Sequence, residues 1–118
     1  MSVLEEVLLE EYDRSMRIKA AIEKEQESLP KGSIQKKLIH GVECYYLQFR
    51  ENDRVKSKYI NANDLDAYKE NISKRKENAA RLKELKQSIK QIEKALGKDV
   101  INEYSTNRVY EIYQALKR

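Results

Sequence analysis

The most reactive side chains in the sequence are Cys44 and His40, the single cysteine and the single histidine of the chain. A thiol beside an imidazole can serve as nucleophile and base, provided that a third polar group orients the ring. We expect the two residues to lie near each other across a hairpin but out of line, and no Asp or Asn is placed to orient His40. We therefore interpret Cys44 as an inert strand residue and His40 as a turn residue.

Other kinds of catalytic chemistry lack the residues that they need. A zinc site needs three or four Cys or His ligands, and the chain has one of each. Asp64 and Asp66 are close enough to suggest a metal-dependent nuclease, but paired carboxylates at a predicted helix start more often cap that helix. Gly32, Gly41 and Gly97 are isolated, so the chain has no glycine-rich phosphate loop. We expect no metal, no cofactor and no enzymatic activity.

The composition of the chain indicates a small domain with exposed helices. Of its 118 residues, 37% are charged and 40% are hydrophobic, which predicts one domain over residues 1–118 with a modest core. A single cysteine excludes an internal disulfide and favours a reducing cytoplasm. No apolar run approaches the ~20 residues that cross a bilayer, so we expect no membrane association.

Hydrophobic periodicity predicts an α+β fold. The predicted elements are a helix over residues 2–28, a three-stranded antiparallel sheet over 33–60, a long helix over 64–96 and a short C-terminal helix over 105–116. Ser2 is the expected N-cap of the first helix, which Pro30 ends. Asn63 or Asp64 is expected to cap the long helix and Gly97 to end it.

The sheet is predicted from three alternating runs that are separated by His40-Gly41 and Asn52-Asp53. Glycine, Asn and Asp tolerate the positive φ of a two-residue hairpin turn. With two-residue turns, one face carries Ile34, Leu38, Tyr45, Leu47, Phe49 and Ile60, with Lys36, Lys56 and Lys58. The other face carries Gln35, Lys37, Ile39, Cys44, Tyr46, Gln48, Val55, Ser57 and Tyr59. The first face is the better predicted core.

Both predicted long helices carry apolar stripes. On the first helix, a main stripe contains Leu4, Val7, Leu8, Ile18, Ala21, Ile22 and Leu29, and a smaller one contains Leu9, Tyr12 and Met16. On the second helix, a heptad seam contains Leu82, Leu85, Ile89, Ile92 and Leu96. Such a seam packs on another helix, either within the chain, which we favour for only two heptads, or in a homodimer.

Basic and aromatic residues alternate along the predicted sheet, within a segment (30–63) that has 7 basic and 3 acidic residues. The candidate nucleic-acid-binding residues are Lys36, Lys37, Arg50, Arg54, Lys56, Lys58, Tyr46 and Tyr59. Basic side chains neutralise phosphates, and exposed tyrosines stack on bases or bind their edges. The alternative is that these are ordinary strand tyrosines beside lysines that protect a sheet edge from aggregation.

The segments "LPKGSI", "HGVECYYLQFR" and "RVKSKYI" resemble the Leu-Pro-x-Gly-Ser, Tyr-Tyr-Leu-Gln-x-Arg and Lys-Ser-x-Tyr-Ile segments of a family of small uncharacterised bacterial and phage proteins. That family is a domain of unknown function found near mobile elements, in which a strand meander precedes a Lys- and Glu-rich helix. The resemblance covers residues 29–97, with Asp53 in place of a family glycine, and implies no activity. More loosely, the sheet resembles the three-stranded arm-binding domains of integrases, which is an analogy of fold alone.

Three hypotheses follow for the function. The first is a non-enzymatic protein of a mobile element or phage that binds nucleic acid or a nucleoprotein complex through the basic sheet. The second is a phage-encoded inhibitor that docks on a bacterial defence complex such as a CRISPR nuclease. The third is a structural dimer that forms through the heptad seam.

Overall fold

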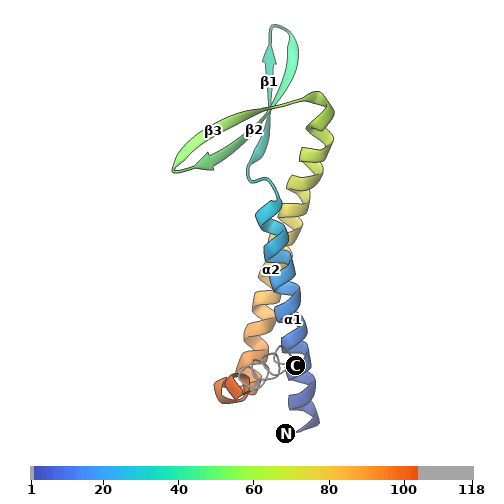
Figure 1. Cartoon of the computed structure of the whole chain (residues 1–118), viewed down its shortest axis with the longest axis vertical. Helices are drawn as coiled ribbons and strands as arrows, with labels where there is room; N and C mark the ends of the chain where they lie inside the picture. The colour runs from blue at the N-terminus through green and yellow to red at the C-terminus, as the bar shows by residue number, and fades with distance from the viewer. Residues whose placement is uncertain (1, 104–118) are drawn as a thin grey trace, which may run out of the picture. The chain divides into compact units, whose positions relative to one another are not determined.

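The computed structural model describes residues 2–103, and its elements follow the predicted order (Figure 1). They are helix α1 (Val3–Ser28), strands β1 (Ser33–Ile39), β2 (Val42–Glu51) and β3 (Arg54–Ile60), the 3-10 turn η1 (Ala62–Asp64) and helix α2 (Leu65–Leu96). Residues 98–103 are helical again. This order confirms the predicted α+β fold, and the helix predicted over 105–116 lies outside the described residues.

The helix ends follow from local sequence. The Ser2 hydroxyl accepts a hydrogen bond from the amide of Glu5 at 3.2 Å, as expected of an N-cap. Asn61 caps the turn η1, since its side chain accepts from the amide of Asn63. The predicted caps, Asn63 and Asp64, instead lie inside this turn. Gly97 adopts φ 85° and donates its amide to the Glu93 carbonyl at 2.9 Å, which is the left-handed C-terminal stop predicted for α2.

The three strands form one antiparallel sheet in the order β1-β2-β3, and its two hairpins share β2 and diverge at their ends (Figure 1). His40 and Gly41 have φ values of 51° and 79°, and Asn52 and Asp53 have 51° and 62°. Both turns therefore have the two positive φ angles of a type I′ hairpin. Both turns have the predicted length of two residues, so the register of the strands is also the predicted one. Ile34 of β1 pairs with Leu47 of β2, and Leu47 pairs with Lys58 of β3.

Gly32 holds the start of the sheet in place. A Cβ built on this residue would lie 2.2 Å from the backbone oxygen of Gln48, and its φ is 120°. Only glycine allows the chain to pass so close to β2 in this conformation. The approach thus fixes where the loop after α1 enters β1.

Contacts between residues group the chain into two compact units. One unit spans Glu23–Arg81 and holds the sheet, the end of α1 and the first half of α2. Of the described residues, the other unit contains 2–22 and 82–103. Its core consists of Leu9 from α1 with Ile92 and Leu96 from α2.

The main stripe predicted for α1 is partly wrong. Leu4 and Val7 are 68% and 54% exposed, whereas Leu9 of the smaller stripe is buried. Ser15 and Ile22, seven residues apart, are also buried. A helix that packs along a second helix buries positions with a repeat of 3.5 rather than 3.6 residues, so the buried side drifts from the face drawn on a 100° wheel.

In the unit that holds the sheet, polar side chains join the two helices. Arg75 of α2 donates from one guanidinium nitrogen to the carbonyls of Gln26 and Leu29, at 2.7 and 3.2 Å. Asn78 donates to the side-chain oxygens of Glu25 and Gln26, at 3.0 and 3.2 Å. In this unit, α1 and α2 therefore contact each other through hydrogen bonds. In the other unit, they contact each other through apolar side chains.

Candidate nucleic-acid interface

The register divides the strand residues between two faces, because successive side chains point to opposite sides of a sheet. The inner face carries Ile34, Lys36, Leu38, Glu43, Tyr45, Leu47, Phe49, Glu51, Arg54, Lys56, Lys58 and Ile60. The outer face carries Ser33, Gln35, Lys37, Ile39, Val42, Cys44, Tyr46, Gln48, Arg50, Val55, Ser57 and Tyr59. Leu47 and Ile60 are 5% and 2% exposed, so the buried part of the sheet lies on the inner face, as predicted, but Leu38 of the same face is 70% exposed.

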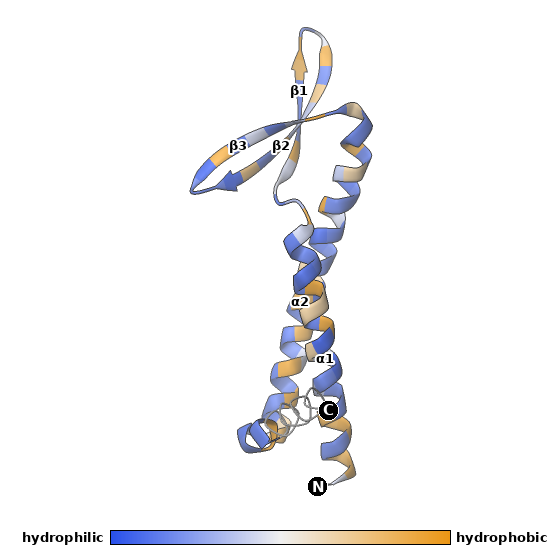
Figure 2. Ribbon diagram, in the orientation of Figure 1, coloured by the Kyte–Doolittle hydropathy of each residue, from blue (hydrophilic) through white to orange (hydrophobic). Residues whose placement is uncertain are grey.

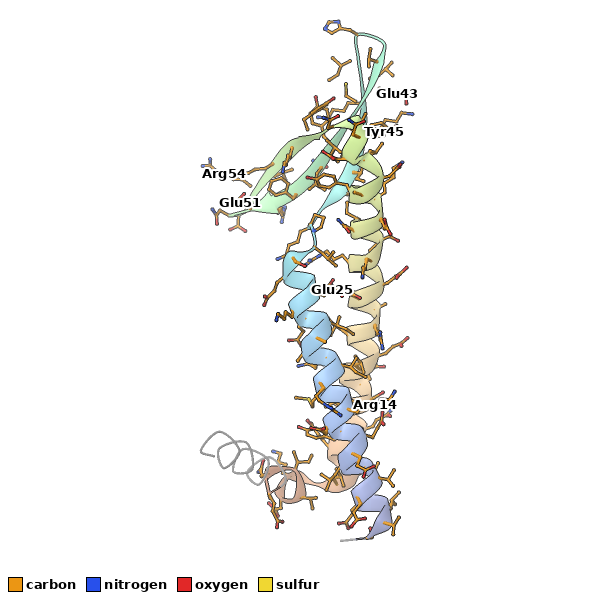
Figure 3. All side chains as sticks on the ribbon, turned by 45° about the vertical axis from the view of Figure 1, so that its right-hand side comes forward. Arg14, Glu25, Glu43, Tyr45, Glu51 and Arg54 are labelled. Carbon is orange, nitrogen blue, oxygen red and sulfur yellow. The ribbon has the colours of Figure 1, made fainter. Side chains whose placement is uncertain are left out.

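The inner face also meets α2. The Lys69 ammonium of α2 lies 5.8 Å from the centre of the Tyr45 ring. Tyr45 is only partly exposed and donates its hydroxyl to Glu43 at 3.4 Å; Figure 3 shows both side chains on the β1-β2 hairpin. The first turns of α2 therefore lie on the inner side of the sheet.

Two glutamates on the inner face neutralise two of the predicted binding lysines. Lys36 pairs with Glu43 at 2.8 Å and Lys56 pairs with Glu51 at 3.3 Å. The hydrogen bond from Lys36 lowers the pKa of the Glu43 carboxyl, and the same bond raises the pKa of Lys36. Each lysine thus has a glutamate partner of opposite charge on its own face.

The outer face has no such neutralisation. Within β1, β2 and β3, all of which the structure describes, both acidic residues lie on the inner face. The Lys37 ammonium lies 5.0 Å from the centre of the Tyr46 ring. The Tyr46 ring in turn makes an edge contact with the Tyr59 ring, at 5.6 Å between centres and 71° between planes. Together they form a row across three strands that ends in Tyr59, which is 59% exposed.

The eight predicted binding residues therefore do not form one surface. Lys37, Tyr46, Arg50 and Tyr59 share the outer face, and Lys36, Arg54, Lys56 and Lys58 lie on the inner face. All eight were predicted from their charge or aromatic character, which does not distinguish the two faces. The alternation of side chains along each strand does distinguish the inner-face residues from the outer-face residues.

Two polar residues of the outer face are not among the predicted binding residues. Gln35 and Gln48 are exposed there and lie in the region where all three strands pair. Beside Gln48, a depression of about 340 Å³ is lined by Gly32, Ser33, Gln48, Phe49, Arg50 and Val55. The exposed Arg50 thus borders a hollow in the surface.

The predicted heptad seam lies in the other unit. Ile89, Ile92 and Leu96 are buried, and Leu82 and Leu85 are partly exposed. Leu9 of the same chain packs with Ile92 and Leu96, which is the intramolecular alternative considered for this seam. A homodimer through the seam stays a prediction.

The described residues contain no group of three or more His, Cys, Asp or Glu that could hold a metal ion. Cys44 lies in β2 and His40 lies in the first turn, the positions predicted for them.

Over residues 2–103, neither long helix has an apolar stretch that could span a bilayer.

Comparison with known proteins gives a family but no activity. No curated protein and no solved structure matches the chain. A protein family of unknown function, DUF6788, matches residues 8–70. The match includes most of α1, the whole sheet and the start of α2, which is more than half of the 118 residues. The chain therefore belongs to the DUF6788 family, whose function is unknown.

Proposed function

We propose that this protein is a non-enzymatic nucleic-acid-binding protein and that the outer face of its sheet is the contact surface. The observation that carries the proposal is the separation of charge. The acidic residues of the strands lie on the inner face, where they pair with lysines, and the outer face presents cations, tyrosines and amides. Such a face attracts an anionic polymer and can bind its bases as well.

The outer face offers two phosphate contacts and one stacking surface. Lys37 pairs with Cys44, and Arg50 lies six residues further along β2, so the two cations are about 20 Å apart along the strand. The exposed Tyr59 ring lies between these two levels, where it pairs with Tyr46. Phosphate contacts at both ends and an aromatic contact between them suit a nucleic acid that runs along β2.

The amide side chains add base-reading capacity. An exposed glutamine can donate and accept at once and can form a bidentate pair with adenine in the major groove. Gln48 lies beside Arg50 and the shallow depression, and Gln35 pairs with Tyr46. The proposed target is DNA or RNA in the bacterial cytoplasm, and the resemblance to proteins found near mobile elements supports a mobile-element or phage nucleic acid.

Fluorescence anisotropy with labelled duplex DNA, single-stranded DNA and structured RNA tests the proposal. We expect binding at about 50 mM salt that weakens as salt rises, with a slope of about −0.9 per phosphate contact on duplex DNA. Absence of affinity for all three ligands at about 50 mM salt, where counterion release favours binding most, would contradict it. Pull-down from host lysate would then test docking on a defence nuclease.

A further inference from the structure

The hairpin of β1 and β2 extends beyond the three-stranded part of the sheet. β3 ends at Ile60, which pairs with Tyr45, and Tyr45 pairs with Lys36 of β1. The three residue pairs beyond that level, starting with Lys37 and Cys44, form a ribbon of only two strands. At ~3.3 Å per residue this ribbon projects about 10 Å, which exceeds the ~7.5–8.5 Å depth of the grooves of B-DNA.

The end of this ribbon is apolar and exposed. Leu38, Ile39 and Val42 are 70%, 40% and 62% exposed, and Ile39 and Val42 form the last pair before the turn. Figure 2 shows hydrophobic colour on β1 close to this turn. The turn contains only His40 and Gly41, so the end of the ribbon is narrow. Apolar residues that a fold leaves exposed together in this way commonly mark a contact surface.

The second hairpin of the same sheet provides a comparison. Its turn, Asn52-Asp53, also has two positive φ angles, but the pair that flanks it is Glu51 and Arg54, which Figure 3 shows at the end of that hairpin. The two hairpins thus have similar turn geometry and opposite chemistry at their ends. The turn type does not require an apolar end, so the apolar residues of the first hairpin need another explanation.

The charge behind the apolar end indicates its partner. Lys37 lies on the same outer face as Ile39 and Val42, two residue pairs further from the turn. Glu43, the acidic residue of this ribbon, lies on the inner face and is paired with Lys36. An apolar tip with an unneutralised cation behind it fits a partner with an apolar interior and an anionic exterior. Stacked bases inside a phosphate backbone have that arrangement.

We propose that the ribbon end is a wedge that enters duplex DNA and partly unstacks one base step with Ile39 and Val42. The inference rests on the proposed function, because the outer face must hold the same duplex. Other DNA-bending proteins insert apolar side chains between base steps in this way and kink the duplex by about 20–90°. Among nucleic acids, duplex DNA is the proposed target of this wedge. Side chains cannot read the deep, narrow major groove of A-form RNA, and a single strand has no paired base step to unstack.

The experiment uses the full chain and a duplex that carries 2-aminopurine beside a flexible TA step and a fluorophore pair at its ends. We expect the protein to raise the 2-aminopurine fluorescence and the energy transfer between the ends, as unstacking and bending require. The double variant Ile39→Ser/Val42→Ser should lose both signals while its affinity falls less than about tenfold, because phosphate contacts dominate affinity. The double variant Val3→Ser/Val7→Ser, which changes exposed residues of α1, should behave as the unchanged protein.

The outcomes separate the two proposals. Duplex binding without a change in either signal would overturn the wedge and leave the proposed function in place. No binding of any nucleic acid would overturn both. Binding to anionic phospholipid vesicles that is lost in the Ile39→Ser/Val42→Ser variant, with no unstacking of the duplex, would overturn the wedge in favour of a lipid surface. Circular dichroism spectra and thermal unfolding show whether the variants keep the fold, which we expect because both substituted side chains of the tip are exposed.

Discussion

The guanidinium of Arg75 donates a hydrogen bond to the backbone carbonyl of Gln26 at 2.7 Å, and the Gln26 side chain donates in return to the carbonyl of Arg75 at 3.1 Å. The Gln26 carbonyl lies in the last turn of α1 and also accepts a hydrogen bond from the amide of Leu29, beyond the helix, at 3.3 Å. Arg75 also reaches the carbonyl of Leu29, beyond the end of α1. A side chain of α2 thus caps α1 and holds the segment that leads into the sheet.

Replacement of Arg75 should therefore destabilise the unit that holds the sheet. We expect Arg75→Met to lower the free energy of unfolding by about 1.5–3 kcal/mol, since it removes charge-assisted hydrogen bonds to two partly buried carbonyls. Arg81→Met, at an exposed position of the same helix, is the matched control and should change it by less than about 0.5 kcal/mol. Urea unfolding followed by circular dichroism measures both. Equal effects of the two substitutions would show that the cap contributes nothing specific.

A side chain at Gly32 should be tolerated far less well than one at Gly41. Both residues have positive φ, but a Cβ at Gly32 would lie 2.2 Å from a backbone oxygen, whereas a Cβ at Gly41 meets nothing within 4 Å. We expect Gly32→Ala to cost about 3 kcal/mol or more, because strain in the backbone adds to the clash. Gly41→Ala should cost about 1–2 kcal/mol from backbone strain alone. Thermal unfolding of the two variants compares them, and a similar loss in both would contradict the close approach.

The sequence predicted the sheet well because its information is local. Two-residue turns and strict alternation determine which residues pair and which face each one occupies. Arg75 and Gly32 could not be identified in this way, because their roles depend on segments distant in sequence. Nothing near Arg75 distinguishes it from the other cations of α2, and the buried side of α1 depends on the helix that packs against it. The eight predicted binding residues all lie on strands of the sheet, but half of them lie on the inner face.

Acid should weaken the contact between the helices at Glu25. The hydrogen bond from Asn78, at 3.0 Å, and the contact with Lys74, at 3.3 Å, lower the pKa of this carboxyl from its ordinary value of 4.5. A lowered pKa in the folded state stabilises the fold fully above pH 4.5, and this stabilisation is lost as the pH falls through the folded pKa. The urea midpoint of Glu25→Gln should therefore fall less than that of the unchanged protein between about pH 6 and about pH 3.

The control for this pH dependence is Glu27→Gln, at an exposed position in the same turn of α1. Its urea midpoint should depend on pH as that of the unchanged protein does. If Glu25→Gln and Glu27→Gln respond to acid alike, the contacts of Glu25 with Asn78 and Lys74 are not the source of the acid sensitivity.

The helical seam should stabilise a single chain. Ile92 is 8% exposed and packs with Leu9 of the same chain, so Ile92→Ala should lower the free energy of unfolding by about 2–4 kcal/mol. Val3→Ala, at a position that is 77% exposed, should have little effect. The loss at Ile92 should not depend on protein concentration if the seam closes within the chain. An unfolding midpoint that rises with concentration, together with a doubled mass in light scattering, would instead support a dimer through this seam.

Nucleic-acid binding should respond to charge on the outer face and much less to equal charge on the inner face. Lys37→Gln and Arg50→Gln each remove a cation that no strand carboxylate on its own face neutralises, so each should reduce the slope of log affinity against log salt by about 1. Lys36→Gln and Lys56→Gln remove the same charge from ion pairs on the inner face. Because the proposed phosphate contacts lie on the outer face, these two substitutions should leave the salt slope nearly unchanged, although each lowers the net charge by the same amount. Anisotropy titrations at several salt concentrations compare the four variants, and equal effects from both faces would show that net charge, rather than the outer face, determines binding.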